Sequence, residues 1–417
     1  MNLRSRYLAG SVAVASAVAG ATLLSLSPAS AAPSAPHAAR LTAAAARVAA
    51  ARVAAARVAA ATVAAQEAAE HPRLRTESIT IASTPGCATV RSRLASLARA
   101  GAARVACAGP ASSGASLGQL APAGSGLCVA GEVVRARHAS CALTTIDYQV
   151  LEVPSGKVLG KGTIAVGYKE ALNAMSRTWP LVAAVELTDA TGVVAADSTA
   201  TTDIACAGGC TSSAPWTQPL VEDKAYTHTF TIDSAGRGTD LTSQVPVVDT
   251  VNPAATDQAA PVRLDSLGPA RCDSDPLLRQ FGKITSGCVF KDVAASYDIY
   301  LTGHGEDQVA LNVVKGQQAK SLHFGWYGHG RALFRAPPSV QARNRQAACG
   351  KTSYKKPYSC DEYPFAATYQ GAFYFPSQNV TMKVPGTENS TEGGLRSAMY
   401  VAERLFYGDS YWVFVLP

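Results

Sequence analysis

The sequence predicts a multidomain α+β protein in which a β-rich, sandwich-like N-terminal region precedes a small α+β domain at the C-terminus. Short β-type segments separated by turn clusters fill the middle of the chain, as in antiparallel sandwiches. Nearer the C-terminus, a β-type run over 380–384 leads through a Pro-Gly turn into a helical pattern. Leu395, Met399, Ala402 and Phe406 follow at helical spacing, and Gly408 is positioned to stop the helix. A final strand is expected over 411–415. The 417 residues are enough for two or three domains of about 150 residues each.

The N-terminus has the features of a secretory signal peptide. Arg4 and Arg6 precede an apolar run from Leu8 to Leu26, and the small residues before and at Ala31 provide a cleavage site. No later segment reaches the roughly 20 apolar residues that span a bilayer. We therefore expect a signal peptide over 1–31 and a secreted, extracellular protein without an integral membrane segment in its mature chain.

Residues 32–75 are rich in alanine and arginine and contain a five-residue Arg-Val-Ala-Ala-Ala repeat beginning at Arg47. Alanine favours a helix, but a step of five residues makes the arginines and valines spiral around it. Because no continuous apolar face results, this segment predicts a low-complexity spacer and not a helix that docks on a core.

Residues 76–244 predict a β-rich module. A helix is expected over 88–100, where Val90, Leu94 and Leu97 fall on one face. Strands are expected over 127–134, 145–153, 157–166, 181–187, 192–196 and 226–232. The module shows no Ser/His/Asp, zinc or phosphate-loop pattern, so its predicted partner is no more specific than a cell-wall or surface polymer.

Residues 245–268 combine prolines with small and polar residues and predict a linker. The C-terminal domain is then expected over 269–417. The net charge of +7 for the whole chain is compatible with a polyanionic partner and does not identify one. His304 and His329 each stand between two glycines and are interpreted as turn residues.

Ten cysteines, an even number in a chain with an export signal, predict a framework of up to five disulfides. Their spacing does not determine the connectivity. The simplest pairing joins neighbours in order: 87–107, 128–141, 206–210, 272–288 and 349–360.

The residues that predict chemistry are two acidic clusters near the C-terminus. Asp361 and Glu362 stand in the string Ser-Cys-Asp-Glu-Tyr-Pro-Phe-Ala, and Glu388 and Asn389 follow a Pro-Gly-Thr turn. Residues 330–417 contain no histidine. If this segment hydrolyses a phosphodiester, its general base must therefore be a carboxylate. On a strand, Asp361 and Glu362 point to opposite faces.

These motifs resemble the signature of the NucA/NucB family of secreted bacterial deoxyribonucleases, over roughly the last 75 residues. In that family a Cys/Arg-Asp-Glu-Tyr/Trp-Pro motif is followed by an Asp/Glu-Asn pair that opens a helix. The resemblance implies a nuclease domain with a ββα-metal-like core that hydrolyses DNA without sequence specificity, through nonspecific backbone contacts. It also implies a divalent metal, Mg²⁺ or Mn²⁺. At one position the chain departs from the family, because Gln370 replaces a frequent acidic residue.

The resemblance assigns roles to particular residues. The catalytic pair is Asp361, as general base, and Glu362. The metal ligands are Asn389, Glu388 and Glu392, with capping of the helix that follows as the alternative role of Asn389. Arg343 and Arg345 are expected to bind the phosphate. A disulfide between Cys349 and Cys360 is expected to hold the catalytic strand.

Two functions follow from these expectations. The leading one is a secreted, metal-dependent deoxyribonuclease, which the Asp361 and Asn389 motifs favour. The alternative is an extracellular binding or surface protein in which the β-rich region carries the function and the nuclease-like domain is inactive, which Gln370 favours.

Overall fold

The computed structural model describes residues 75–78, 81–83, 86–108, 128–196, 198–206, 209–234, 241–243, 247–253, 260–264, 267–352 and 354–417. The signal peptide expected over 1–31, and the spacer expected over 32–75 apart from Arg75, lie outside the described residues. The described part is a mixed α+β structure that is rich in antiparallel strands.

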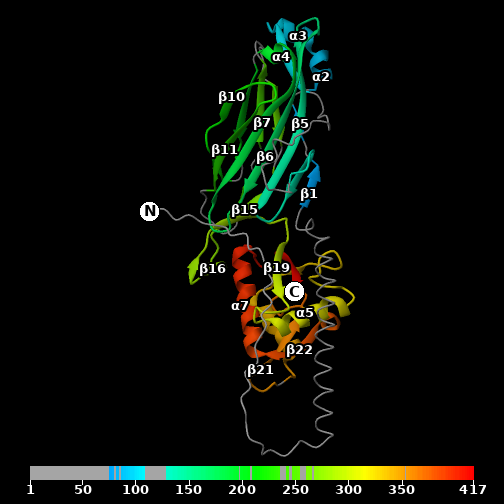
Figure 1. Ribbon diagram of the computed structural model, residues 1–417, viewed down its shortest axis with the longest axis vertical. Coiled ribbons are helices and arrows are strands. Elements are labelled where there is room, and N and C mark those ends of the chain that lie inside the picture. Colours follow the sequence, from blue (N-terminus) through cyan, green and yellow to red (C-terminus); the bar gives the residue numbers. More distant parts are fainter. Residues whose placement is uncertain are drawn as a thin grey trace, which may run out of the picture. The chain divides into compact units, whose positions relative to one another are not determined.

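Two antiparallel sheets form the β-rich region. The eight-stranded sheet runs in the order β1-β4-β5-β6-β7-β11-β9, with β3 paired to β5. Its strands are β1 Arg75–Ser78, β3 Arg104–Ala108, β4 Glu132–Arg135, β5 Ala139–Glu152, β6 Val158–Ala171, β7 Thr178–Gly192, β9 Thr211–Ser212 and β11 Ala225–Asp233. Figure 1 shows the long strands β5, β6, β7 and β11 side by side. The five-stranded sheet follows the order β10 Trp216–Leu220, β8 Ser198–Ile204, β13 Val247–Pro253, β14 Ala260–Leu264 and β2 Ile81–Ser83.

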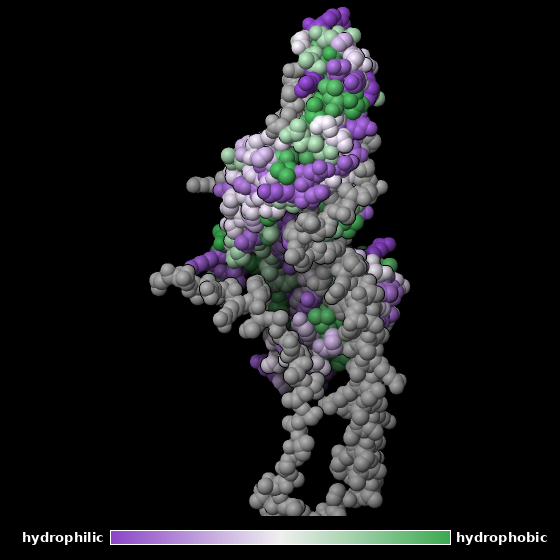
Figure 2. All heavy atoms as spheres, turned by 45° about the horizontal axis from the view of Figure 1, so that its top comes forward, coloured by the Kyte–Doolittle hydropathy of each residue, from purple (hydrophilic) through white to green (hydrophobic). Residues whose placement is uncertain are grey.

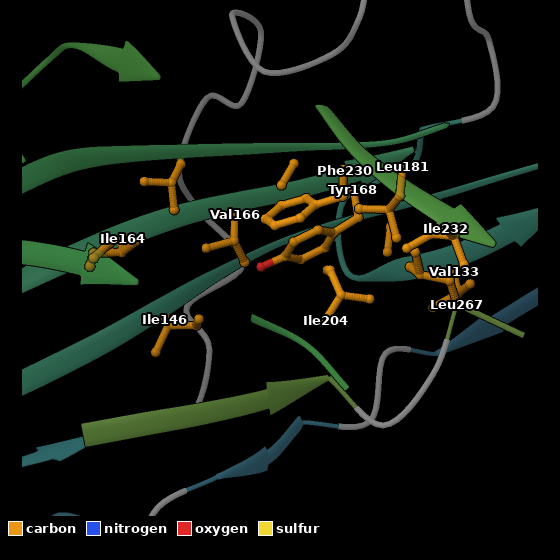
Figure 3. Close-up of a cluster of buried hydrophobic side chains, with 14 of the residues drawn as sticks. Val133, Ile146, Ile164, Val166, Tyr168, Leu181, Ile204, Phe230, Ile232 and Leu267 are labelled. Atoms are coloured by element: carbon orange, nitrogen blue, oxygen red, sulfur yellow. The ribbon is translucent and has the colours of Figure 1, made fainter. Parts of the chain in front are cut away.

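One hydrophobic core combines side chains from both sheets. Tyr168 and Phe230 from the eight-stranded sheet and Ile204 from the five-stranded sheet belong to the same buried cluster, and Figure 3 shows them close together. β-branched and aromatic residues suit this environment because they pack well on a pleated, buried surface. The expectation of a β-rich region is confirmed, and its sandwich-like form stays a prediction.

Three local expectations for this region were wrong. The helix expected over 88–100 is two short helices, α2 Cys87–Ser92 and α3 Leu94–Arg99, because Arg93 leaves helical backbone geometry between them. The strand expected over 192–196 is instead the one-turn helix α4 Val193–Ala196. Residues 245–268, expected as a linker, contain β13 and β14, whose ladder hydrogen bonds join them to β8 and β2.

The segment after β14 also packs with the β-rich region. β12 Leu241–Ser243, β15 Ala270–Asp273 and β18 Gly287–Phe290 form a three-stranded sheet, and a hairpin of β16 Arg279–Gln280 and β17 Lys283–Ile284 lies between β15 and β18. Leu267, Cys272 and Phe290 belong to the core shared by the two larger sheets. A separate core starts at Ala295. The division of the chain into domains stays a prediction, and these contacts favour a boundary near 294 over the one at 268.

The second core is built from helices on a small sheet. β19 Ala295–Tyr300 runs parallel to β23 Ser410–Leu416, and β20 Leu333–Phe334 pairs antiparallel with β23. Helices α5 Asp307–Ala319 and α6 Pro338–Cys349 connect these strands to the rest of the domain. Pro338 suits the first turn of α6, where its missing N–H would have had no partner within the helix.

A β-hairpin followed by a helix completes the C-terminal part. β21 Tyr358–Tyr363 pairs antiparallel with β22 Val380–Pro385, after the short 3-10 helix η1 Pro376–Gln378, and α7 Gly386–Ala402 follows directly. The expected strand over 380–384 and the expected final strand are present. The helix was expected to reach Phe406 and stop at Gly408, but it ends at Ala402.

All five expected disulfides are present: Cys87–Cys107, Cys128–Cys141, Cys206–Cys210, Cys272–Cys288 and Cys349–Cys360. Among the described helices, none combines the length and the apolar character needed to cross a membrane. On the face in Figure 2, hydrophobic residues form small patches among hydrophilic ones, which is usual because apolar atoms make up much of any folded surface.

Candidate active site

The hairpin of β21 and β22 presents the two acidic residues of the first motif. Asp361 pairs with Met382 and Glu362 with Thr381 in the ladder. Because successive side chains of a strand alternate between faces, the two carboxylates point to opposite sides of the hairpin, as expected. Asp361 contacts α5, and Glu362 contacts α6.

Asp361 is buried against α5. Its side chain is 4% exposed, and Asn312 Nδ2 donates a hydrogen bond of 2.8 Å to its Oδ2. Burial raises the pKa of Asp361 to about 8, against the opposing effect of the Asn312 hydrogen bond, and the nearby Glu392 carboxylate raises it further. A carboxyl group that titrates near neutral pH is suited to exchange a proton with a reacting water.

Glu362 is buried on the α6 side of the hairpin. Its Oε1 lies 3.4 Å from Arg345 Nε, and its Oε2 lies 3.3 Å from Cys349 Sγ. Cys349 is bonded to Cys360, so its sulfur has no proton to donate and this is a packing contact. Burial raises the pKa of Glu362, and Arg345 opposes that shift.

Asn389 connects α7 to strand β21. Its Nδ2 donates to Ser359 Oγ at 3.0 Å and to the Cys360 carbonyl oxygen at 3.1 Å. Pro385 occupies the N-cap position of α7, which has no capping side chain. The alternative role of Asn389 as a helix cap was therefore wrong, and its side chain instead faces β21.

The two expected glutamate ligands on α7 have other partners. Glu388 Oε2 accepts a hydrogen bond of 2.6 Å from the Gln308 backbone nitrogen, in the first turn of α5. Glu392 is 1% exposed and forms an ion pair with Arg396, one helical turn away, with contacts of 2.7 and 3.2 Å. The structure brings Glu392 close enough to Asp361 to raise its pKa, whereas Glu388 is engaged at the N-terminus of α5.

The buried charges fit a divalent cation. Glu306, Asp361, Glu362 and Glu392 are all nearly inaccessible, and the ion pairs that involve them use two arginines, Arg345 and Arg396. Glu306 Oε2 and Asn312 Oδ1 are buried without a hydrogen-bond partner. Unpaired buried carboxylates are costly unless they are protonated or bind a cation, and Mg²⁺ and Mn²⁺ prefer oxygen ligands.

The ligand atoms are not gathered in advance. In the described part of the chain, the one group of three acidic, histidine or cysteine ligand atoms within 4.8 Å of one another comprises Cys349, Cys360 and Glu362. Both cysteines are oxidised in a disulfide and offer no thiolate. This group is therefore not a metal site.

A basic pocket of about 490 Å³ opens between α6 and α7. It is lined by Arg335, Arg345 and Arg396, together with Ser359 and Asn389, and none of its described lining residues is acidic. Arg345 stands at the exposed side, with 60% of its side chain accessible, whereas the Arg396 side chain is 10% accessible. Three arginines that line one space suit a phosphate-containing anion.

Arg343 and Gln370 both lie outside the basic pocket. Arg343, expected beside the phosphate, lies over the Phe373 ring at 4.7 Å and donates to Tyr374 Oη, outside the residues that line the pocket. Gln370 is not in the pocket either. Its Oε1 accepts a hydrogen bond of 2.9 Å from the Phe334 backbone nitrogen and so holds strand β20.

Sequence reasoning missed Asn312, Arg335 and Arg396. The four-residue spacing of Glu392 and Arg396 was a usable signal, because such pairs meet on one face of a helix. Arg335 and Asn312 lie in segments without a recognisable motif. The tertiary structure alone brings them to the site.

Comparison with known proteins supports the expected resemblance. Residues 330–414 match the family model described as Deoxyribonuclease NucA/NucB. The match runs from just before β20 into β23 and includes Asp361, Glu362, Asn389 and Arg396, but not Asn312. No match was found among curated proteins or solved structures. The family resemblance of the C-terminal part is confirmed, and it suggests a nuclease function with DNA as substrate.

Proposed function

We propose that this protein is a secreted, metal-dependent deoxyribonuclease that cleaves DNA phosphodiester bonds without sequence specificity. The observation that carries the proposal is the basic pocket inside the segment that matches the deoxyribonuclease family. Its lining includes Asn389 and also Arg345, the ion-pair partner of Glu362. The consecutive elements β21, β22 and α7 support a ββα-metal-like core, because Asn389 on the helix contacts the first strand.

Hydrolysis of a phosphodiester needs a deprotonated water aimed in line with the leaving oxygen, and a means of neutralising the added charge on the phosphoryl oxygens. Asp361 is proposed as the general base, since burial brings its pKa to about 8. Asn312 holds the Asp361 carboxylate by a hydrogen bond and so sets its orientation. Arg335, Arg345 and Arg396 are proposed to bind the phosphate.

Glu392 and Asn389 are the residues that we propose would hold a Mg²⁺ or Mn²⁺ ion, which leaves Asp361 free to accept a proton. A bound divalent ion supplies a positive charge that polarises the phosphoryl oxygen and lowers the pKa of water. Glu362, which lies against Arg345, is proposed to set the position of that arginine at the exposed side of the pocket. Glu388 has a smaller role in this proposal because it is bonded to α5.

Five disulfides support a protein that works outside the reducing cytosol. This agrees with the signal peptide that the sequence predicts over 1–31.

The test is an in-gel assay of the purified full chain on DNA, with RNA as a second substrate. We expect clearing of the DNA gel in Mn²⁺ or Mg²⁺, loss of clearing in EDTA, and recovery when the metal is restored. If clearing is undiminished in excess EDTA, DNA cleavage does not depend on a divalent metal and this part of the proposal is wrong. Absence of clearing with every divalent metal would favour the alternative of a binding protein with an inactive nuclease-like domain.

A further inference from the structure

One loop forms a wall of the basic pocket and also contacts the β-rich region. Residues 403–409 follow α7, and Arg335 is bonded to them three times. Its Nη1 donates to the Leu405 carbonyl oxygen, its backbone nitrogen donates to the Asp409 carbonyl oxygen at 3.0 Å, and its own carbonyl accepts from Gly408 at 2.8 Å. The guanidinium of Arg335 also lies 5.1 Å from the Tyr407 ring centroid. The position of Arg335 therefore depends on this loop.

Arg137, in the turn between β4 and β5, holds the same loop from the β-rich side. Its Nε and Nη2 donate to the Glu403 carbonyl oxygen at 3.1 and 2.8 Å, and its Nη1 donates to the Val293 carbonyl oxygen at 2.7 Å. The side chain is 6% exposed. Because the guanidinium is planar and rigid, a buried arginine that donates to several backbone carbonyls fixes the positions of those carbonyls relative to one another.

Arg271 on β15 adds a second fixed point. Its two terminal nitrogens donate to the two oxygens of Asp409 at 3.0 and 2.6 Å, and its guanidinium lies 4.2 Å from the centre of the Phe406 ring. A bidentate pair of this kind restrains both distance and orientation. Asp409 is the residue whose carbonyl oxygen accepts from the Arg335 backbone.

Arg404 anchors the start of the loop. It has a left-handed φ of 46°, unfavourable for a residue with a side chain. Its guanidinium is fully buried, pairs with the Asp273 carboxylate, with Nε 2.9 Å from Oδ2, and donates to the Ala174 carbonyl oxygen at 2.8 Å. These contacts explain why α7 stops at Ala402, before the expected glycine.

We propose that Arg137 and Arg271 are positioning residues for Arg335, so that the β-rich region orders the phosphate-binding wall of the nuclease site. Domains of one chain are expected to move relative to each other unless their interface is extensive. Here, several buried hydrogen bonds from arginines of the β-rich region fix the loop that holds Arg335. The inference rests on the proposed function to the extent that Arg335 binds DNA phosphate.

The experiment measures the affinity of the full chain for a fluorescein-labelled DNA duplex in EDTA, so that binding is read without cleavage. Arg335→Met should weaken binding roughly tenfold, the typical size of a lost charge-assisted hydrogen bond. Arg137→Met should weaken binding by a smaller factor. Because Arg137 is proposed to act through Arg335, the double variant Arg137→Met/Arg335→Met should bind no more weakly than Arg335→Met alone. Arg91→Met is the matched control, because Arg91 donates to Gly156 within the β-rich region and should leave affinity unchanged.

Circular dichroism and thermal unfolding accompany every variant. If Arg137→Met does not fold, Arg137→Lys and Arg271→Lys replace it, since lysine keeps the charge but cannot span the same acceptors. Multiplicative losses in the double variant, or a lower Tm with unchanged DNA affinity, would overturn the inference. A wild-type chain that binds the duplex but never cleaves it would contradict the nuclease proposal. The positioning role of Arg137 would still be supported if the double variant binds no more weakly than Arg335→Met.

Discussion

At the scale of single residues, the two adjacent carboxylates differ because their surroundings differ. Asp361 accepts a hydrogen bond from a neutral amide, whereas Glu362 lies beside the guanidinium of Arg345. Burial raises the pKa of both carboxyls. The Glu392 carboxylate raises the pKa of both, but the largest opposing influence is a neutral amide, Asn312, at Asp361 and a cation, Arg345, at Glu362. These differences favour Asp361 over Glu362 as the group that takes up a proton.

The first prediction concerns the rate. Asp361→Asn keeps the shape of the side chain and removes the proton acceptor, so DNA cleavage should fall by about 10²–10⁴-fold, the usual loss for a general base. Initial rates on a labelled duplex would measure it. His329→Ala is the control, because His329 is exposed and its ring rests against Trp326. If the histidine variant is inactive and Asp361→Asn is active, the base is the histidine.

The second prediction concerns pH. Because a base must be ionised to act, kcat/KM should rise with pH and level off above about 8, the pKa of buried Asp361. The pKa in the folded state lies above the ordinary value near 3.9. Asp361 therefore contributes fully to the free energy of unfolding below its ordinary pKa near 3.9. This contribution is lost as pH rises through about 8, the pKa in the folded state.

The stability part of this prediction is checked by thermal unfolding in EDTA across the same pH range. The decline in Tm between pH 4 and 8 should be shallower in Asp361→Asn than in the wild-type chain, since the asparagine does not titrate. If Tm declines equally with pH in the two proteins, titratable groups other than Asp361 control the pH dependence of stability.

At the scale of elements, the buried face of α7 is polar. Glu392, Arg396 and Tyr400 point inward at four-residue intervals, whereas Leu395 is 43% exposed. The sequence had suggested that Leu395 and Met399 mark the inner face, because apolar residues usually do. Here the inner face is polar because Glu392 and Arg396 neutralise each other in a buried ion pair.

The third prediction concerns the disulfide that joins α6 to β21. Replacing Cys349 and Cys360 by alanine frees Glu362 and Arg345 to separate, so cleavage should fall. The loss of stability should be about 2–4 kcal/mol, as is typical for a native disulfide. Rates and denaturant unfolding of the double variant would measure both effects. The matched control is the pair Cys206 and Cys210, which closes a short loop in the β-rich region and should leave the rate unchanged.

At the scale of the whole molecule, the net charge of +7 gives little information on where DNA binds. The three pocket arginines are the specific signal. Because each neutralised phosphate releases counterions, three contacts predict that log K falls with log salt with a slope of roughly −3.

The salt slope is the fourth prediction, measured by duplex binding in EDTA over a series of salt concentrations. Arg345→Met should reduce the slope by about one, as expected for a single lost phosphate contact. Arg343→Met should leave it unchanged, because Arg343 packs on Phe373 and not in the pocket. Equal effects of the two substitutions would place the DNA elsewhere.

Local signals in the sequence determined the features that depend on neighbours in the chain. Several strands of the β-rich region, the family resemblance and the disulfide framework follow from periodicity, motif and cysteine count, and the simplest pairing of neighbouring cysteines proved right. Such signals are readable because residues one to four positions apart share a face of a strand or helix. The expected strand over 192–196 was wrong because five residues are too few to distinguish a helical turn from a strand.

Only the tertiary structure decided the contacts between distant segments. Asn312 reaches Asp361 across 49 positions, and Arg137 reaches Glu403 across 266. Nothing in the composition of these segments predicts such partners, because a buried polar group is satisfied by whatever the fold places beside it. The supposed linker at 245–268 is two strands for the same reason: its backbone hydrogen bonds are made to β8 and β2, far away in the chain.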